Sequence, residues 1–282
     1  MWYKRIGTYK TGFRYFKNNS QITDIKLLER FKGLKIAPAY ENVSINSDKN
    51  AKIQAYGYDS KKRKQVLYHS DFIKEQSVKK YERFLRLENQ INKIKKIMSR
   101  DIKGDNIKKK EIGIIIFMIL YCGFRIGNEK YVKENNSYGL TTLEFRHLLF
   151  KNNKIIIEFV GKKGVINKSI CSNKIIYEYL LNKKNKCTNS DNVFGISSKN
   201  VNDYLKNINS EITSKDLRTW NANNLFLKYI NDIHILKDKN PIKKSIEKVA
   251  ENLHNTPAIC RKSYLHPEII FLIENKIKND KL

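Results

Sequence analysis

The residue pattern changes near position 71, and this change constrains the fold more than any other feature of the 282-residue chain. Residues 1–70 form short runs rich in Tyr, Phe, Ile and Val, punctuated by glycine and proline, which is typical of strands and tight turns. From Asp71 onward, apolar residues recur every three or four positions, as in a helix with one buried face: Phe84, Leu87, Ile91, Ile94 and Met98. The sequence therefore predicts an α+β protein with a small β-rich N-terminal domain, residues 1–73, and a larger, mainly α-helical domain, residues 74–282.

Shorter patterns predict individual elements. We expect a helix at about 24–32 and a β-hairpin from 51–58 and 63–69, with its turn at 59–62. A second hairpin is expected from 154–160 and 165–170, and helices near 173–183, 199–207 and 214–230. Pro241 and Pro257 suit the first position of a helix. The apolar run 112–122 is shorter than the roughly 20 residues that cross a bilayer, so it predicts a buried core helix.

The charge balance indicates a polyanionic partner. The chain has 56 Lys and Arg against 28 Asp and Glu, a formal net charge of +28. The basic residues are spread along the chain and no strongly amphipathic terminal helix is evident, which favours nucleic acid over a membrane surface. The four cysteines show no metal-ligand or disulfide spacing, and the N-terminus has no apolar signal core. We therefore expect an intracellular protein in a reducing compartment.

Four reactive side chains lie in separate motifs. Arg125 lies in CGFRIG, Lys162 in FVGKK, Arg218 in KDLRTW and Tyr264 in NTPAICRKSY. Displacement at a phosphodiester builds negative charge on non-bridging oxygens, which planar guanidinium groups bind well. A lysine on a hairpin tip can protonate a leaving sugar oxygen, and a tyrosine with cationic neighbours can attack phosphorus although its ordinary pKa is about 10. The set therefore suits phosphoryl transfer.

Each candidate also has a plainer interpretation. Most of the 16 tyrosines must be packing or surface residues. Arg218 follows Asp216 closely and could form a surface salt bridge. Lys163 is the alternative to Lys162 as the proton donor, and either lysine could instead be a solvated turn charge. The chain has no GxxxxGK[ST] nucleotide loop and no paired acidic motif for magnesium, so we expect neither ATP nor a metal cofactor.

Together these motifs resemble the type IB DNA topoisomerases, in particular their compact poxvirus-like and bacterial branch. The resemblance covers nearly the whole chain: GFRIGNEKY continues into YGLTTL, and the later motifs follow in the family's order and approximate spacing. It implies the tyrosine recombinase and type IB topoisomerase fold, with the two domains forming a C-shaped clamp around DNA and a hinge near 71–77. It also implies that a monomer relaxes supercoiled duplex DNA through transient single-strand cleavage, a 3′-phosphotyrosyl intermediate, swivelling and religation, without ATP or a required metal.

The family's roles transfer position by position. The resemblance implies that Tyr264 is the nucleophile, that Arg125 and Arg218 clamp the scissile phosphate, and that Lys162 is the general acid. Poxvirus enzymes have His nine positions before the nucleophile, where this chain has Asn255. An amide can donate a hydrogen bond to a phosphate oxygen, but not as a cation.

Other residues are implied to contact DNA. The strand RKQVLY resembles the one that faces the major groove in the family, and a tyrosine after the first arginine motif resembles a further backbone contact. The expected DNA-binding residues are Arg63, Lys64, Gln65, Tyr68, Tyr56, Lys163 and Tyr131. Whether the N-terminal tyrosines contact bases or pack in the core stays open, as does any contribution of His254.

Two other functions compete with this one. A tyrosine recombinase would use the same fold and covalent chemistry, but usually has His three residues before the second arginine, where this chain has Lys215. A non-catalytic DNA-binding protein would not need all four reactive side chains. Neither the cleavage-site sequence nor the source can be derived; the protein would act in a virion or host cytoplasm if viral, and in the cytoplasm or nucleoid if bacterial.

Overall fold

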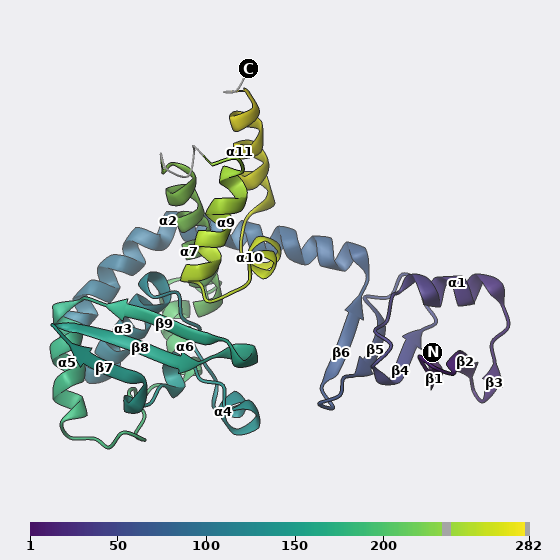
Figure 1. Ribbon diagram of the computed structural model, residues 1–282, viewed down its shortest axis with the longest axis horizontal. Helices are drawn as coiled ribbons and strands as arrows, with labels where there is room; N and C mark the ends of the chain where they lie inside the picture. The colour runs from purple at the N-terminus through teal and green to yellow at the C-terminus, as the bar shows by residue number, and fades with distance from the viewer. Residues whose placement is uncertain (233–237, 280–282) are drawn as a thin grey trace. The chain divides into compact units, whose positions relative to one another are not determined.

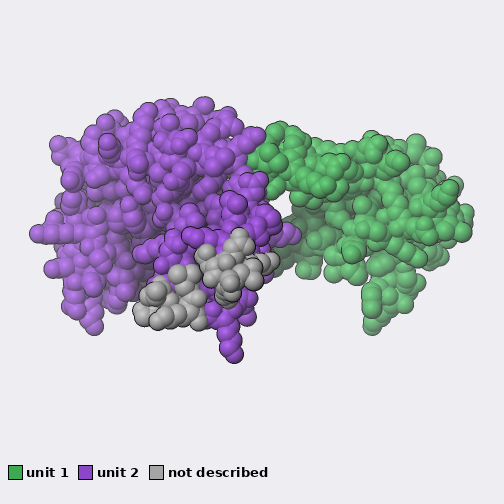
Figure 2. All heavy atoms as spheres, turned by 90° about the horizontal axis from the view of Figure 1, so that it is seen from above, with its two compact units in different colours: residues 1–80 green, residues 81–282 purple. Residues whose placement is uncertain are grey.

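The computed structural model describes residues 1–232 and 238–279. The chain divides into two compact units, Met1–Lys80 and Tyr81–Leu282, which Figure 2 distinguishes by colour. The boundary between them lies within helix α2 (Ser70–Lys103). Residues 71–77, where we expected a hinge, form the first turns of this helix. Each unit contains hydrophobic core residues of its own.

The N-terminal unit is an antiparallel β-sheet with helix α1 (Ile25–Gly33) on one face. Phe31 of α1 is 1% exposed, and its ring centroid lies 5.1 Å from that of Tyr3 and 4.9 Å from that of Tyr15. Helix α1 and the β5–β6 hairpin confirm the elements expected at 24–32 and 51–69. The strands lie in the order β3-β2-β1-β4-β5-β6 (Figure 1), with bounds β1 (Trp2–Thr8), β2 (Gly12–Lys17), β3 (Ser20–Gln21), β4 (Glu41–Asn46), β5 (Ile53–Tyr58) and β6 (Lys64–Tyr68).

Helices α2 and α3 (Ile107–Tyr121) supply much of the core of the second unit. The predicted apolar stripe of α2 is buried from Phe84 to Met98, and Ile114, Ile115 and Ile116 of α3 are each 0% exposed. The buried core helix expected around 112–122 is therefore confirmed. No helix within residues 1–232 and 238–279 is long and apolar enough to cross a membrane. The other helices of this unit are α4 (Glu129–Asn135), α5 (Lys174–Lys184), α6 (Ser198–Ile208), α7 (Ser214–Ile230), α9 (Pro241–Asn252), α10 (Pro257–Ser263) and α11 (Pro267–Asn279).

A small antiparallel sheet of β7 (Leu148–Lys151), β8 (Lys154–Val160) and β9 (Ile166–Cys171) lies against these helices (Figure 1). Its inner face contributes Ile155, Ile157 and Phe159 to the core, because alternate residues of a strand point to one side. The β8–β9 hairpin confirms the one expected at 154–170. Near its tip, a Cβ on Gly161 would lie 2.2 Å from Asn167 Nδ2, so a larger residue there would displace the Asn167 side chain.

A second core cluster packs α7, α9 and α10 together through side chains such as Phe226, Val249 and Cys260, each 0% exposed. Helices α9 and α10 begin at Pro241 and Pro257, as predicted, because a proline at the first helical position removes an N–H that would otherwise be unpaired. Three of the expected site residues lie on or next to these helices: Arg218 in the second turn of α7, Asn255 between α9 and α10, and Tyr264 directly after α10. Strand β7 and helix α4 were not anticipated from the sequence.

Candidate active site

Tyr264 stands immediately after the short helix α10. Pro257 starts the helix, and Thr256 Oγ1 caps it by accepting a hydrogen bond from Ile259 N at 3.3 Å. Tyr264 N donates to Cys260 O at 3.0 Å, which ties the tyrosine to the last turn. The partly buried phenol therefore projects from a position set by a capped helix.

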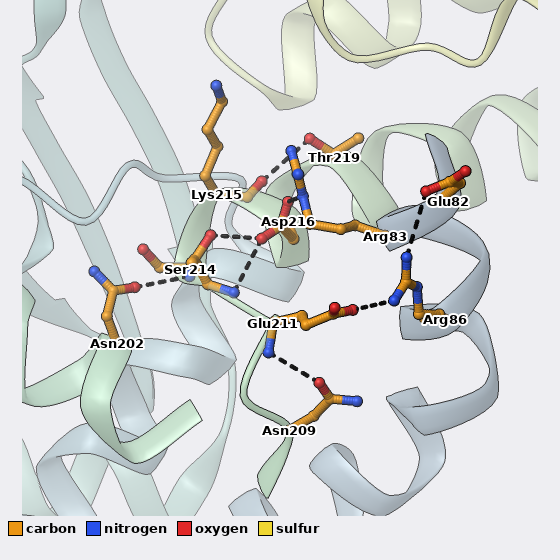
Figure 3. A network of polar contacts seen from close by, with 11 residues as sticks. Glu82, Arg83, Arg86, Asn202, Asn209, Glu211, Ser214, Lys215, Asp216 and Thr219 are labelled. Carbon is orange, nitrogen blue, oxygen red and sulfur yellow. Dashed lines mark hydrogen bonds and ion pairs between the residues drawn. The ribbon is translucent and has the colours of Figure 1, made fainter. Parts of the chain in front are cut away.

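Arg218 lies in the second turn of α7, and a polar network holds the start of this helix (Figure 3). The Asp216 carboxylate accepts hydrogen bonds from Thr213 N at 3.0 Å and Thr213 Oγ1 at 2.6 Å. Its other oxygen lies 3.5 Å from Arg83 Nε of α2, while the Lys215 side chain points away from the network (Figure 3). The carboxylate that could have paired with Arg218 is thus engaged elsewhere.

The Arg218 guanidinium is buried at 3% exposure among backbone carbonyls. Its two terminal nitrogens donate to Gly123 O and Leu253 O, and Nε donates to Tyr264 Oη at 3.3 Å. The second N–H of each terminal nitrogen is not used in these contacts. Burial lowers the pKa of Arg218 to about 10, so the group still carries its charge at neutral pH. The interpretation of Arg218 as one half of a surface salt bridge is wrong.

Arg125 approaches the same place from the turn that follows α3. Gly123 in this turn has φ +66°, and a Cβ there would lie 2.0 Å from Asn252 O. The lack of a side chain at Gly123 therefore lets this turn pass close to the backbone of Asn252. Arg125 NH2 donates to Asn255 Oδ1 at 2.5 Å, so the turn and the end of α9 meet at these two side chains.

Asn255 keeps one polar group unused. Its Oδ1 accepts from Arg125, whereas its buried Nδ2 has no hydrogen-bond partner within the described part of the chain. A buried donor without a partner costs about 1–3 kcal/mol, so such groups usually serve a ligand or a strained site. The Asn255 amide is thus available to an acceptor that enters the site.

The pKa of Tyr264 is lowered by its cationic neighbours. Burial alone would raise the pKa of the phenol, but the charge of Arg218, and then that of Arg125, outweighs it. The hydrogen bond from Arg218 and the nearby Asn255 amide lower the pKa further, although Asn255 Nδ2 lies outside ordinary hydrogen-bond geometry. The tyrosinate is therefore easier to form here than in water.

Neither Arg125 nor Arg218 forms an ion pair with a carboxylate of the described residues. The Arg125 charge instead lowers the pKa of Arg218, because two like charges lie close together. Two cations that share a partly buried site without a counter-ion favour an anion between them. With the free Asn255 donor, the cluster of Arg125, Arg218, Asn255 and Tyr264 is an anion site with a phenol at its edge.

His254 packs beneath this cluster. Its Nε2 lies 3.1 Å from Cys122 O, and its ring stacks on Phe124 with centroids 5.2 Å apart. Burial lowers the pKa of His254, and the charges of Arg218 and Arg125 lower it further. The neutral His254 ring, already hydrogen-bonded to Cys122 O, therefore has a packing role next to the cluster.

Lys162 is not part of the cluster. It lies in the turn Lys162–Gly164 at the tip of the β8–β9 hairpin, exposed to solvent, and it makes no hydrogen bond or ion pair with the residues that the structure describes. Its neighbour Lys163 is also exposed and has φ +66°. The end of β8 next to this turn is held to the segment after α4 by a hydrogen bond from Tyr138 N to Val160 O at 2.8 Å.

The expected DNA-binding residues of the N-terminal unit occupy its edge hairpin. Lys64 Nζ lies 4.0 Å from the centroid of the Tyr56 ring, whose other neighbour is Trp2 at 5.1 Å. Arg63 NH2 lies 2.7 Å from Asp59 Oδ2, and the same oxygen accepts from Gln65 at 3.0 Å. Tyr68 is 42% exposed, and in the second unit Tyr131 on α4 is 53% exposed. Trp2 is a member of this aromatic and basic surface that the sequence reasoning missed.

Sequence reasoning also missed a residue that holds the backbone on both sides of Leu265. Asn223 of α7 is 1% exposed, and its Nδ2 donates to Tyr264 O at 2.9 Å. Its Oδ1 accepts from His266 N at 2.8 Å. The available signal was an asparagine within a helix that also carries Arg218, since a buried polar side chain must find partners.

Comparisons with known proteins show which family the chain resembles. A model of the catalytic core of eukaryotic DNA topoisomerase I matches residues 69–281, and a model of the N-terminal domain of bacterial DNA topoisomerase IB matches residues 12–59. The DNA topoisomerase 1B of Acanthamoeba polyphaga mimivirus is 30% identical over 297 residues, which cover 97% of this chain and 87% of the viral protein. The DNA topoisomerase 1B of vaccinia virus (strain Copenhagen) is 29% identical over 230 residues, 78% of this chain and 72% of that protein.

The chain therefore belongs to the type IB DNA topoisomerase family. The resemblance inferred from the motifs is confirmed, and so is the expectation of a β-rich N-terminal region followed by a helical core.

Proposed function

We propose that this protein relaxes supercoiled duplex DNA as a type IB topoisomerase, through a covalent 3′-phosphotyrosyl intermediate. The observation that carries the proposal is the position of Tyr264 Oη, 3.3 Å from Arg218 Nε in a site with two unpaired guanidinium charges. The names of its relatives, DNA topoisomerases of mimivirus and vaccinia virus, support the same activity.

In the proposed cleavage step, the Tyr264 oxygen attacks the phosphorus and the bond from phosphorus to the 5′ oxygen breaks. The phenol gives its proton to water, and the charges of Arg218 and Arg125 that lower its pKa also stabilise the negative non-bridging oxygens. Asn255 Nδ2 donates to one of those oxygens, which gives its unpaired amide a partner. The expected roles of nucleophile and clamp are thus retained as a proposal.

Lys162 supplies the proton that the leaving 5′ oxygen requires. The lysine must meet the DNA from the exposed hairpin tip, because it has no contact with the cluster among the described residues. Religation reverses each step: the 5′ hydroxyl attacks the phosphotyrosine, returns its proton to Lys162 and releases Tyr264. The phosphodiester energy is kept in the tyrosyl ester, so no ATP is consumed and no metal is required.

The two domains, 1–73 and 74–282, close as a C-shaped clamp on the duplex, with 71–77 as the hinge. The aromatic and basic hairpin of the N-terminal domain, with Lys64 and Tyr56, then binds DNA outside the cleavage site. The protein acts as a monomer inside the cell, in a virion or host cytoplasm if viral and in the cytoplasm or nucleoid if bacterial. The net charge of +28 supports tight, salt-sensitive binding to duplex DNA.

The decisive experiment incubates the protein with supercoiled plasmid in EDTA without ATP. We expect relaxation, and a covalent protein–DNA adduct when the reaction is stopped with detergent. Tyr264→Phe removes the nucleophile and should lower the relaxation rate by about 10⁴-fold or more, with no adduct.

Tyr229→Phe is the matched control, because Tyr229 Oη accepts from Asn252 at 2.8 Å and lies outside the cluster. It should relax plasmid at the unaltered rate. An adduct formed by Tyr264→Phe would disprove the assignment of the nucleophile. Cleavage that depends on magnesium would indicate a nuclease instead, and strand exchange between duplexes would indicate a recombinase.

A further inference from the structure

The segment Tyr264–His266, which joins α10 to α11, is held by side chains from two other helices. Asn223 of α7 binds both ends of it, through Tyr264 O at 2.9 Å and His266 N at 2.8 Å. Leu265 between them is 0% exposed in the second core cluster. Helix α7 also carries Arg218, whose Nε contacts the Tyr264 phenol. The same helix therefore fixes the position of this segment relative to Arg218.

Tyr81 of α2 holds the same segment from another helix. Its hydroxyl donates to Leu265 O at 3.0 Å, the carbonyl of the residue next to the nucleophile. Its ring packs against the His266 ring in a tilted arrangement, with centroids 4.0 Å apart and planes 37° apart. The ring centroid of Phe84, one turn further along α2, lies 5.9 Å from that of His266. Hydrogen bonds from Asn223 of α7 and Tyr81 of α2 therefore both fix the backbone of this segment.

This second contact matters because Tyr264 lies beyond the end of α10. The last carbonyl groups of a helix have no partner within the helix, so the chain that follows is set by outside contacts. The phenol reaches Arg218 at 3.3 Å, close to the limit of a hydrogen bond. A displacement of the segment by about 1 Å would break that contact, and errors of this size in a reacting geometry cost about a hundredfold in rate.

We propose that Tyr81 is a positioning residue for the nucleophile: it fixes Leu265 and His266, and so sets how closely the Tyr264 phenol approaches Arg218. This inference rests on the proposed function, because it needs Tyr264 to be the attacking group. Tyr81 itself touches neither DNA nor the reacting atoms in this scheme. It acts through the backbone of the segment.

The test measures the single-turnover rate of covalent adduct formation at saturating protein, as a function of pH. Tyr81→Phe keeps the ring and loses the hydrogen bond, and should slow cleavage about fivefold. Tyr81→Leu also loses the ring contact with His266 and should slow cleavage about a hundredfold. In both variants the rise of rate with pH should move to higher pH, because a phenol further from Arg218 ionises less readily. The dissociation constant for uncleaved DNA should not change.

Tyr204→Phe is the matched control, since the Tyr204 hydroxyl donates to Asp101 on the same helix α2, away from the cluster. It should lower the melting temperature and leave the rate and its pH profile unaltered. A normal rate and profile for both Tyr81 variants would overturn the inference. So would slower cleavage with an unshifted pH profile, which is the result expected of a residue that only stabilises the fold.

Tyr264→Phe, measured beside them, separates the two ideas. If it still forms the adduct, the proposed function fails. If it forms none while the Tyr81 variants behave like the unsubstituted protein, only the positioning role fails.

Discussion

The cluster around Tyr264 and the hairpin tip at Lys162 are built in opposite ways. Arg218 is 3% exposed, is bonded to two carbonyls and to the phenol, and shares its site with Arg125 and Asn255. Lys162 stands on an exposed turn without a partner in the described chain. The groups proposed to bind the phosphate are therefore already in contact in the protein alone, whereas the proposed proton donor must be brought to the site by the DNA that the hairpin meets. The following predictions test this difference.

The largest loss of cleavage rate is expected from a substitution in the cluster around Tyr264. Arg218→Ala removes a charge that both lowers the pKa of Tyr264 and faces the phosphate, so single-turnover cleavage should slow about a thousandfold. It also leaves Gly123 O and Leu253 O unpaired, so the melting temperature should fall as well.

Arg218→Lys keeps a charge in the pocket and should recover part of the stability but little of the rate, because an ammonium cannot make the same fork of contacts. Arg86→Ala is the control for loss of an arginine, as Arg86 pairs with Glu211 at the surface network of Figure 3. Cleavage by Arg218→Ala at the normal rate would show that the organised cluster is not the catalytic one.

Lys162→Ala tests the proposed proton donor on the exposed hairpin tip. Cleavage should slow about a hundredfold while the dissociation constant for DNA changes less than about threefold, because many other phosphate contacts hold the duplex. A substrate with sulfur in place of the bridging 5′ oxygen should restore most of the lost rate, since a thiolate leaves without a proton.

Lys163→Ala is the neighbouring control on the same turn, and should change the cleavage rate less than about threefold. Equal losses of binding and cleavage in Lys162→Ala, or no rescue by sulfur, would contradict a proton-donor role.

Arg125→Ala should slow cleavage about thirtyfold and change its pH dependence. The Tyr264 pKa is depressed by Arg218 and Arg125 against the opposing effect of burial, so removing one charge raises it. Because the attacking form is the phenolate, the rise of rate with pH should then move to higher pH. A slower reaction with the original pH profile would assign Arg125 to phosphate binding alone.

The smallest effect is expected in the N-terminal unit. Lys64→Ala should weaken DNA binding about two- to threefold at 0.15 M salt and reduce the slope of log K against log salt by about one. Arg63→Ala should do less, because Arg63 already pairs with Asp59, whose pKa it lowers to about 2. Fluorescence anisotropy on a labelled duplex measures both, and an Arg63 effect larger than that of Lys64 would reverse this ranking.

Much of the fold could be predicted because the signals were local. The apolar spacing from Phe84 to Met98 predicts a helix with one buried face, and Thr256-Pro257 predicts the start of α10, since both depend on neighbours within one or two turns. The contacts of Arg218 could not be predicted in this way. Asp216, two residues earlier, was an obvious local partner. Its carboxylate instead accepts a hydrogen bond from Thr213 N and pairs with Arg83 from another helix.

The sequence by itself determined the order and identity of the reactive groups and the positions of the main helices and hairpins. It also determined the net positive charge, which indicates a polyanionic partner. These follow from residue types and short-range spacing. Only the tertiary structure decided that Gly123 lets two backbone segments pass close together and that Asn255 Nδ2 has no partner in the described chain. It also decided that Tyr81 and Asn223 form hydrogen bonds with the backbone of residues 264–266. Such contacts join residues far apart in the chain, and they depend on how helices pack, which no local pattern specifies.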